Sequence, residues 1–339
     1  ALMWYKKAAI KGDKRARSKV LMWYEKAAEQ GDAQAQYECG KMFASEKALM
    51  WYEKAAEQGL ADAQLDCAYM YYKGWGTSED KEKALMWYEK AAEQGIAEAQ
   101  YKCGRMYDKG EGTPEDKAKA LMWYERVAER DDARRVNQIW VQIRCGDMYR
   151  WGEGTSEDKE KALMWYEKVA ERRNAVLTQC ECGDMYYNGE GTPEDKEKAL
   201  MWYEKAAERG NAWAQFRCGD MYYNGEGTEA DRTKARMWYE EVGRRSVLGR
   251  HSITQFHYDE LQKELDYCRT TRTAEVKKMI DEARRLGDLS ENEAYHEAKE
   301  AEGDLYYRIE KMEKILQQAH IVVNQHFNPI CGGEISAKI

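Results

Sequence analysis

The stretch from residue 77 to residue 113, TSEDKEKALMWYEKAAEQGIAEAQYKCGRMYDKGEGT, decides the fold of this chain. Its first half has the periodicity of a helix, with apolar side chains at i, i+3 and i+7 along two neighbouring stripes. One stripe holds Ala84, Trp87 and Ala91, and the other holds Leu85, Tyr88 and Ala92. A helix with two apolar stripes needs neighbours on both sides, as the helices of a stacked array have.

A second, shorter helical pattern follows Gly95, which ends the first helix. We expect the inner face of this partner helix to hold Ala99, Cys103 and Met106. Residues 110–112 then form a glycine-rich loop, and the next helix starts within the string TPED. There Pro114 suits the first helical position, and Thr113 or Asp116 can cap the helix. The stretch is therefore one unit of two helices and a loop.

The same unit recurs along most of the chain. The string MWY occurs eight times, and successive copies are 19, 28, 36, 36, 42, 37 and 36 residues apart. The tryptophans of these strings are Trp4, Trp23, Trp51, Trp87, Trp123, Trp165, Trp202 and Trp238. A fixed period near 36 residues is typical of a solenoid built from stacked repeats. We therefore predict an all-α protein whose first part is an α-solenoid of helical-pair repeats.

Composition limits the class of protein. The chain has 339 residues, of which 43% are hydrophobic and 34% are charged, and its formal net charge is -8. It is too apolar for a disordered chain, and no run approaches the roughly 20 apolar residues that span a bilayer. The acidic balance argues against general binding to nucleic acid or to a membrane surface. Since no secretory signal starts the sequence, we expect a cytoplasmic protein without a membrane partner.

Nine cysteines are present, and six of them occupy one equivalent position in successive repeats. These six are Cys39, Cys67, Cys103, Cys145, Cys182 and Cys218. An odd total with one cysteine per repeat does not resemble a disulfide framework, and Cys180 and Cys182 lack further ligands at a zinc spacing. We expect free cysteines that pack as small buried hydrophobes in a reducing compartment.

The repeat pattern resembles a known family. Read as A-x-A-Q-x-x-x-G-x-M-Y-x-x-G-x-G-T-x-E-D-x-x-K-A-x-x-W-Y-E-K-A-A-E-x-G, it is similar to the Sel-one-like repeats, which are relatives of tetratricopeptide repeats. The family usually has Leu where this chain has Cys. The resemblance covers residues 1 to about 245 and implies a curved scaffold that holds other proteins. The G-x-G-T loops lack a following G-K-S/T, so we interpret them as turns and not as phosphate-binding loops.

The composition changes after residue 252. All five histidines lie beyond residue 250, and MWY no longer occurs. Two long helical patterns follow, over about residues 258–286 and 288–320. Their predicted seams are Leu261, Leu265, Cys268, Val276, Met279 and Ala283 on the first helix and Ala298, Glu302, Leu305, Ile309, Met312, Leu316 and Ala319 on the second. The second seam alternates by four and three residues, which predicts an antiparallel coiled-coil hairpin about 45 Å long.

The turn of this hairpin reads GDLSENEAYHEAK, residues 287–299. A purely structural account is available, in which Gly287 ends one helix, Asp288 caps the next and Glu291 closes a capping box. Asp288 and Glu291 are three residues apart, so they lie on one side of the first helical turn. Both carboxylates would stay ionised there, beside the positive end of the helix dipole.

The wider string resembles a second family. Residues 253–322 are similar to the N-terminal coiled coil of the bacterial Gre transcript-cleavage factors, through LQKELDY, EVKKMIDEARRLGDLSEN, YHEAKEAEG and RIEKMEKILQQAHIV. The resemblance implies that the hairpin enters the secondary channel of RNA polymerase. There the two tip carboxylates help to hold a Mg²⁺ and a water, and the polymerase cleaves the 3′ end of a backtracked transcript. The chain itself would then be no enzyme, with no cofactor or small-molecule substrate of its own.

Carried over position by position, the resemblance assigns roles to six residues. Asp288 and Glu291 would be the acidic pair that shares Mg²⁺ with the polymerase, and Asn292 and Tyr295 would support the tip. The two basic residues that flank the tip would face RNA phosphate, and they are Arg284 and Lys299. Ordinary surface charge is the alternative for these two. This chain reads N-E-A-Y where the family usually reads N-A-E-Y, which moves one Glu by about 100° around the helix.

We therefore predict three parts: the solenoid over residues 1–248, the Gre-like hairpin over 252–323, and a linker or the start of a further domain over 324–339. The expected function is that of a transcription elongation factor that acts on RNA polymerase and the 3′ end of nascent RNA, while the solenoid binds an unidentified protein. Two alternatives stay open: an inhibitory binder of the polymerase channel, and an adaptor whose hairpin is a spacer or dimerisation coil. The chain begins within a repeat and ends soon after the hairpin, so we expect it to be part of a longer bacterial product.

Overall fold

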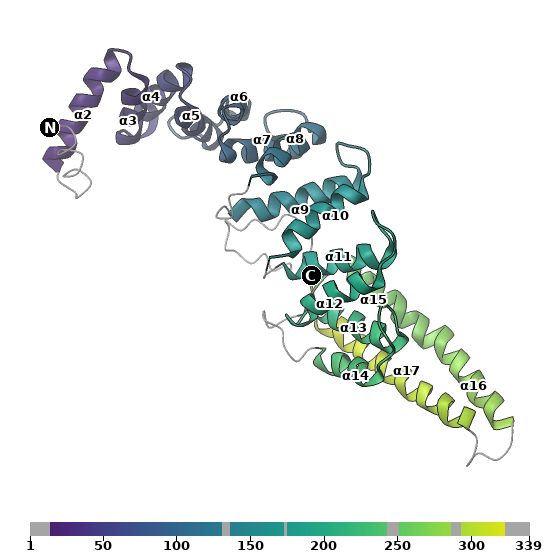
Figure 1. Ribbon diagram of the computed structural model, residues 1–339. Coiled ribbons are helices and arrows are strands. Elements are labelled where there is room, and N and C mark those ends of the chain that lie inside the picture. Colours follow the sequence, from purple (N-terminus) through teal and green to yellow (C-terminus); the bar gives the residue numbers. More distant parts are fainter. Residues whose placement is uncertain (1–13, 131–135, 173–174, 243–250, 286–292, 323–339) are drawn as a thin grey trace. The chain divides into compact units, whose positions relative to one another are not determined.

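The computed structural model describes residues 14–130, 136–172, 175–242, 251–285 and 293–322 (Figure 1). The chain divides into two compact units, residues 1–157 and residues 158–339. Helices dominate both units, which confirms the predicted all-α class. No helix within the described ranges is both long enough and apolar enough to cross a membrane.

The first unit is a run of helices in which each helix packs on the next one along the chain. Its helices are α2 (Lys14–Glu29), α3 (Ala33–Met42), α4 (Ser45–Glu57), α5 (Ala61–Lys73), α6 (Lys81–Glu93), α7 (Ala97–Lys109), α8 (Lys117–Ala128) and α9 (Val136–Trp151). This nearest-neighbour arrangement is that of a solenoid, as the period of the sequence predicts.

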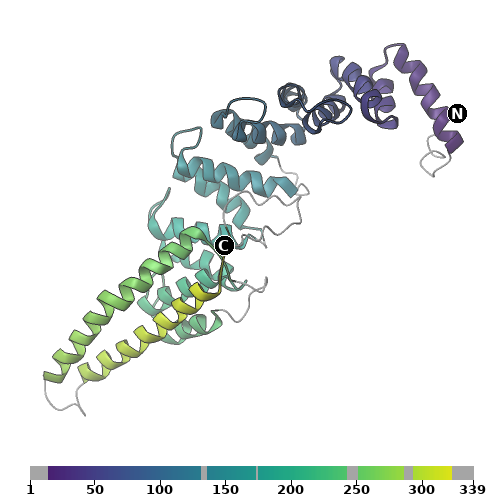
Figure 2. The same ribbon diagram turned by 180° about the vertical axis from the view of Figure 1, so that it is seen from behind.

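The second unit continues the helical pairs and then adds the hairpin, drawn in green and yellow in Figure 2. Its repeat helices are α10 (Lys159–Ala170), α11 (Val176–Asn188), α12 (Lys196–Ala207), α13 (Ala212–Asn224) and α14 (Arg232–Glu241). The hairpin consists of α15 (Gln255–Tyr267), a π-helical turn (Cys268–Arg272), α16 (Thr273–Arg285) and α17 (Glu293–Gln318). α16 and α17 pack on each other, as a hairpin requires.

Both apolar stripes predicted for the repeat are buried. In α6 the buried side chains are those of Ala84, Leu85, Trp87, Tyr88, Ala91 and Ala92. In α7 the predicted inner face is buried as well, and its residues are Ala99, Cys103 and Met106. The core of the array is therefore the layer between successive helices, and the sequence period of the stripes predicts it correctly.

The helix starts differ in one detail from the prediction. α8 begins at Lys117, and the side chain of Asp116 accepts a hydrogen bond at 2.9 Å from the backbone N–H three residues later. Thr113 and Pro114 precede the helix, so Asp116 is the cap and Pro114 does not occupy the first helical position. The reason is a backbone hydrogen bond of 2.9 Å from the Asp116 N–H to the Tyr107 carbonyl, which turns the chain back onto α7 before the helix can begin.

Two glycines shape the loop between α7 and α8. Gly110 has a φ of +66° and Gly112 a φ of +73°, a region that residues with a Cβ disfavour. A Cβ on Gly112 would also collide with the backbone of Lys81, at the start of α6. The G-x-G-T loops are therefore tight turns that pass close to the preceding helical pair.

All eight cysteines in the described part of the chain are free and buried, including the six that recur in the repeats. Burial raises the pKa of these thiols, to about 11 for Cys39 and for Cys268. Among the described residues, no group of three or more His, Cys, Asp or Glu side chains is arranged to hold a metal ion. The repeat cysteines thus pack as small core residues, as the sequence predicts.

The first arm of the hairpin differs from the prediction after its π-helical turn. Seam residues that are buried as predicted are Leu261, Leu265, Cys268, Val276 and Ala283. Met279 is wrong: its side chain is 43% exposed, and Ile280 is buried in its place. The π turn over Cys268–Arg272 accounts for the spacing of eight residues from Cys268 to Val276, one more than a heptad. After the turn, Ile280, four residues beyond Val276, takes the seam position that the prediction gives to Met279.

α17 is buried on more than its predicted seam. Its fully buried seam residues are Ala298, Leu305 and Met312, and its half-buried ones are Glu302, Ile309 and Leu316. Ile315, which is not on the predicted seam, is fully buried. Ile315 lies seven residues after Arg308, on the same stripe of the helix. That stripe faces the last repeat, since Arg308 bonds to α13.

Two short strands join the ends of the hairpin. β1 (His251–Thr254) and β2 (Ala319–Val322) pair in parallel, with His251 opposite Ala319 and Thr254 opposite Val322. α17 therefore ends at Gln318, and the predicted helix to residue 320 is too long. The strand pair ties the first and last residues of the hairpin together at its base.

Candidate functional site

The predicted acidic tip is not described by the structure. Asp288, Glu291 and Asn292 all lie in the turn between α16 and α17, outside the described residues. Their roles, and the capping box built on the same turn, stay predictions. The structure does describe the two helix ends that carry this turn, Arg285 and Glu293.

The three other predicted tip residues are described, and two of them meet across the hairpin. The guanidinium of Arg284 on α16 lies 5.9 Å from the ring centre of Tyr295 on α17, which joins the two helices beside the turn. Lys299 lies one helical turn after Tyr295 and is hydrogen-bonded to Glu302, a bond that raises the pKa of the ammonium group. Arg284 and Lys299 are about half exposed, so both cations face solvent close to the tip.

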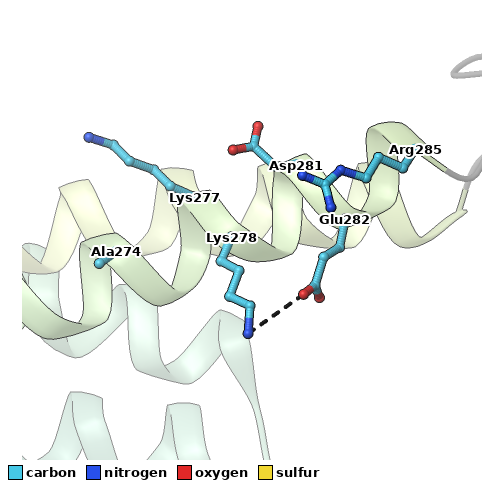
Figure 3. A pocket seen from close by; sticks show the side chains of 6 residues that line it. All are labelled: Ala274, Lys277, Lys278, Asp281, Glu282 and Arg285. Atoms are coloured by element: carbon cyan, nitrogen blue, oxygen red, sulfur yellow. Dashed lines mark ion pairs between the residues drawn. The ribbon is translucent and has the colours of Figure 1, made fainter.

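Figure 3 shows a hollow on the outer face of α16. All of its lining residues come from this one helix, and they are Ala274, Lys277, Lys278, Asp281, Glu282 and Arg285. Every residue except Ala274 is charged, and Lys278 pairs with Glu282 at 3.7 Å. Small-molecule sites are mostly apolar and enclosed by several elements. This hollow is therefore a solvated, charged surface of the hairpin.

A partly buried ion pair joins the hairpin to the last repeat. Arg308 on α17 donates from Nε and Nη2 to the two carboxylate oxygens of Asp220 on α13, at 2.9 Å each. Asp220 is 3% exposed and also accepts from the Tyr239 hydroxyl at 2.6 Å. Arg308 has a second carboxylate partner at 2.9 Å, Glu264 on α15. Burial alone would lower the pKa of Arg308, but Asp220 raises it, so the guanidinium stays charged inside the interface.

A second buried pair lies nearer the start of the hairpin. His257 Nε2 on α15 lies 2.6 Å from Asp184 Oδ2 on α11, and both side chains are buried. The imidazole stacks on Trp213 with 4.9 Å between the ring centres, and Asp184 also accepts from the Tyr203 hydroxyl at 2.6 Å. Burial alone would raise the pKa of Asp184, but His257 and Tyr203 lower it overall. Asp184 is therefore held in its ionised form.

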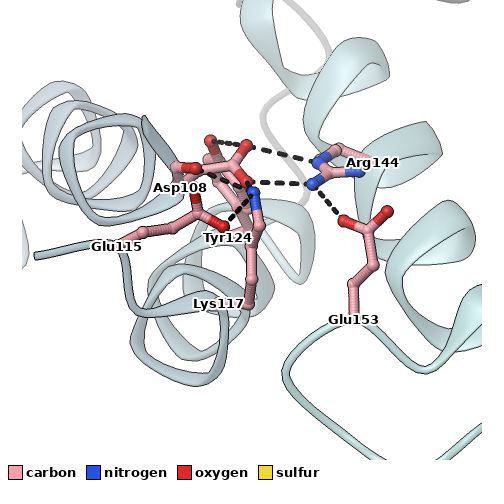
Figure 4. Close-up of polar contacts among 6 residues, drawn as sticks. All are labelled: Asp108, Glu115, Lys117, Tyr124, Arg144 and Glu153. Atoms are coloured by element: carbon pink, nitrogen blue, oxygen red, sulfur yellow. Dashed lines mark hydrogen bonds and ion pairs between the residues drawn. The ribbon is translucent and has the colours of Figure 1, made fainter. Parts of the chain in front are cut away.

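A third buried acid, in the first unit, serves the repeats themselves (Figure 4). Asp108 on α7 accepts from Lys117 at 2.8 Å, from Arg144 at 2.9 Å and from the Tyr124 hydroxyl at 3.3 Å. Arg144 also pairs with Glu153 at 2.5 Å. Burial alone would raise the pKa of Asp108, but the hydrogen bonds from Arg144 and Lys117 outweigh this effect, so the pKa lies below its usual value. These partners belong to neighbouring helices of the array, which indicates a role in stacking repeats.

Asp184 and Asp220 share one position of the repeat, two residues after the repeat cysteine, and neither is predicted from the sequence as a contact. The sequence nevertheless contains a signal for this contact. The string C-G-D-M-Y occurs in the last three repeats, where its acids are Asp147, Asp184 and Asp220. Earlier repeats have Lys41, Tyr69 and Arg105 at this position. Because an acidic residue occupies this position only in the three repeats nearest the hairpin in sequence, the change could have pointed to a contact with the hairpin.

Two family models match the chain. The Sel1 repeat matches residues 1–13, 21–32, 33–60, 61–96, 97–132, 141–174, 177–211 and 214–241. The N-terminal domain of transcription elongation factors GreA and GreB matches residues 251–321. The first model thus covers the repeat array, and the second covers the hairpin that is seated on α11 and α13.

Two relatives with curated names match a segment of the chain. Transcription elongation factor GreA of Nautilia profundicola is 45% identical over 73 residues, which are 22% of this chain and 45% of the relative. The protein of the same name from Oceanobacillus iheyensis is 42% identical over 77 residues, which are 23% of this chain and 49% of the relative. The chain therefore spans about half the length of the curated relatives it matches.

A solved structure matches most of the chain. It is the crystal structure of a protective antigen present in uropathogenic Escherichia coli strains, which displays an SLR fold. The TM-score is 0.51 at 26% sequence identity, and the match covers 90% of this chain and 72% of the other. The fold agrees with the repeat matches, which extend over most of the residues. The chain belongs to the Sel1 repeat family, and its repeats are followed by a GreA/GreB N-terminal domain.

Proposed function

We propose that the chain is a transcription elongation factor-like protein. Its hairpin binds RNA polymerase through the secondary channel and stimulates cleavage of backtracked transcripts. One observation carries the proposal: residues 251–321 match the N-terminal domain of GreA and GreB, and this segment includes the tip string GDLSEN at residues 287–292. A pair of helices that served only as a spacer would have no need for this string.

Asp288 and Glu291 are the acting residues in this proposal. Two carboxylates suit Mg²⁺, which prefers oxygen ligands and is often held by only one or two carboxylates from a protein. When bound, such an ion supplies activation of a water and stabilisation of the leaving oxygen in phosphodiester cleavage. Asn292 and Tyr295 support the turn that presents the two acids. The polymerase remains the enzyme, and this chain lends it side chains.

Arg284 and Lys299 place positive charge on both helices beside the tip. Each is about half exposed, so its charge can reach a phosphate group outside the hairpin. The contact of Arg284 with Tyr295 keeps one of these cations near the turn. In this proposal the two residues contact the phosphates of the nascent RNA, which adds affinity without reading the base sequence.

The repeats act as a protein-binding scaffold in the cytoplasm. α11 and α13 already hold a helical segment, the hairpin of the same chain, through Asp184 and Asp220. Stacked helical pairs present an extended surface of this kind along their whole length. We infer that repeats outside the hairpin contact bind a further protein, and the proposal includes no small-molecule or membrane partner.

A transcript-cleavage assay tests the proposal. The full chain and Mg²⁺ are added to a stalled, backtracked bacterial elongation complex, and the length of the RNA is followed over time. We expect faster RNA shortening with the wild-type chain, and a return to the rate of polymerase alone with Asp288→Ala plus Glu291→Ala. The matched control, Asp281→Ala plus Glu282→Ala, removes the same charge from the exposed face of α16 and should keep the activity.

An adaptor is the second candidate function. The observation that favours it is the buried contact of the hairpin with α11 and α13, which makes the hairpin part of the repeat structure. The apolar seam of the hairpin is already buried, which favours a spacer over a dimerisation coil. If the chain stays on polymerase without cleavage, it is an inhibitory channel binder, and if it neither binds nor cleaves, the adaptor remains.

A further inference from the structure

The second arm of the hairpin is held against the last repeat close to its tip. Glu300 on α17 pairs with Arg232 on α14 at 2.7 Å, and Tyr307 packs edge-on against Tyr239 with 6.2 Å between ring centres. Among the described residues, the Glu300 pair is the ion pair between hairpin and repeat that lies nearest the turn. Only residues 293–299 of α17 extend past it, which is about 10 Å of helix.

This placement limits how far the hairpin can enter a channel. The first arm, from Gln255 to Arg285, is about 46 Å long at the rise of an α-helix. The second arm is clear of α14 over less than a quarter of that length. A channel that closes around two helices cannot also admit a third helix on the same face of α17. Deep entry therefore requires this face of α17 to leave the repeat.

We propose that docking of α17 on α13 and α14 is an autoinhibitory contact that keeps the hairpin out of a polymerase channel until the contact opens. The inference rests on the proposed function, because it takes the polymerase channel as the destination of the hairpin. In the open state the hairpin swings about its base. Glu300 then moves more than Arg308, because it lies farther from the base along α17.

The contact includes two ion pairs and an aromatic pair, whereas the interior of the hairpin is apolar. α17 meets the last repeat through Arg308 with Asp220, through Glu300 with Arg232 and through Tyr307 against Tyr239. The seam inside the hairpin is instead made of Leu, Val, Ile, Ala and Met side chains. A buried ion pair adds less net stability than its contacts suggest, and polar interfaces within one chain permit relative motion. The hairpin can therefore stay folded when it separates from the repeat.

Each charge of the Arg308–Asp220 pair keeps a partner on its own side of the contact. Asp220 keeps the Tyr239 hydroxyl at 2.6 Å, within the repeat. Arg308 keeps Glu264 at 2.9 Å, within the hairpin. The main cost of breaking a buried pair is the uncompensated charge that it leaves behind, and these two additional bonds reduce that cost. The geometry thus suits a contact that opens and closes.

The base of the hairpin is held differently. His257 and Asp184 are both buried and lie 2.6 Å apart, and the imidazole stacks on Trp213. The strand β1, directly before α15, also packs against α13. We therefore assign the pivot to this end, and we expect it to stay docked when α17 opens.

Hydrogen exchange on the full chain tests the opening itself. Asp220→Asn removes the charge that holds Arg308 but keeps an acceptor for the Tyr239 hydroxyl. We expect faster exchange in α14 and in residues 300–311, with unchanged exchange in α15 and in α10–α12. Glu240→Gln, which removes one exposed charge from the same repeat, is the matched control and should exchange like the wild type.

A second variant distinguishes loss of the contact from a folding defect. Glu300→Arg places two cations together at an exposed position, where each side chain is more than half accessible. It should open the contact without disturbing the core, and Arg232→Glu added to it should close the contact again. Recovery on charge reversal separates loss of this contact from general destabilisation.

Binding to a stalled bacterial elongation complex then tests whether opening of the contact increases the affinity for polymerase. If a closed state limits binding, affinity rises in proportion to the open fraction, and we expect Asp220→Asn to bind about tenfold more tightly than the wild type or Glu240→Gln. Equal binding by all forms would overturn the autoinhibitory contact and leave the proposed function intact. Faster exchange in the variants without polymerase binding by any form would overturn the proposed function, and autoinhibition with it. Unchanged hydrogen exchange in both Asp220→Asn and Glu300→Arg would also overturn the proposal of an autoinhibitory contact.

Discussion

At the residue scale, the repeats stack closely because a glycine faces a tyrosine ring. In α7, Gly104 follows the repeat cysteine, and a Cβ added to it would lie 2.5 Å from Cε1 of Tyr124 on α8. The same relation occurs between Gly183 and Tyr203 and between Gly219 and Tyr239. The tyrosines of these three MWY strings therefore leave no room for a side chain opposite them, which accounts for the glycine in these C-G strings.

Gly104→Ala should destabilise the first unit. Tyr124 is fully buried and its hydroxyl bonds to Asp108, so the ring cannot move away without losing contacts. We expect a loss of about 1–3 kcal/mol in the free energy of unfolding, the usual cost of overpacking a core, measured by urea denaturation. Gly303→Ala is the matched control: it is also helical, nothing lies within 4 Å of its Cβ position, and it should gain up to about 1 kcal/mol. Equal effects at the two sites would show that the tyrosine ring adapts.

At the scale of the elements, the sequence predicts the repeat helices well because each repeat carries its own boundaries. Asp116 begins α8 and Gly110 ends α7, as the residue types indicate. The π-helical turn over Cys268–Arg272 is not predictable in this way, since it depends on the fit of two arms that are distant in sequence. It is stabilised locally, because the Thr273 hydroxyl bonds to the Cys268 carbonyl at 2.7 Å. The error at Met279 lies after this turn, within α16: a seam residue can follow Val276 by three or by four positions, and the structure buries Ile280 at four.

Deleting Thr271 should convert the π turn into regular α-helix without disturbing the seam. The extra residue of the turn is removed, so Val276 and Ile280 keep their positions on the buried face, and we expect the free energy of unfolding to change by less than about 1 kcal/mol. Deleting Lys277 is the matched control, because it lies after the turn and brings Asp281 onto the seam. That deletion should cost about 2–4 kcal/mol. Thermal unfolding followed by circular dichroism compares the two, and similar losses would contradict the role given to the π turn.

At the scale of the whole molecule, the contact between the hairpin and the repeats is less predictable from the sequence than the repeats themselves. The pairs of His257 with Asp184 and of Arg308 with Asp220 join residues 73 and 88 positions apart, and no local pattern encodes such contacts. They place the hairpin in one compact unit with the repeats that follow residue 157. The boundary predicted between residues 248 and 252 stays a prediction. The acidic residues of the tip come from the string GDLSEN alone.

Cysteine labelling can report whether the hairpin and the last repeat unfold together. Cys268 lies in the hairpin, 3.7 Å from Arg308 Nη1, and Cys218 lies in α13, two residues before Asp220. Both are buried and their thiol pKa values are raised, so neither reacts quickly in the folded chain, because the thiolate is the nucleophile. Pulsed alkylation along a urea series, read by mass spectrometry, gives the urea concentration at which each cysteine becomes reactive.

In the wild type we expect Cys268 and Cys218 to become reactive at the same urea concentration, because the partly buried Arg308–Asp220 pair couples the hairpin to the repeat. In Asp220→Asn, Cys268 should react at a lower concentration than Cys218, since the hairpin then depends on its own short seam. Cys103, in the first unit, is the internal control and should not shift. A Cys268 that already reacts well before Cys218 in the wild type would mean that the hairpin gains no stability from its seat on the repeats. The contact would then be too weak to hold the hairpin closed.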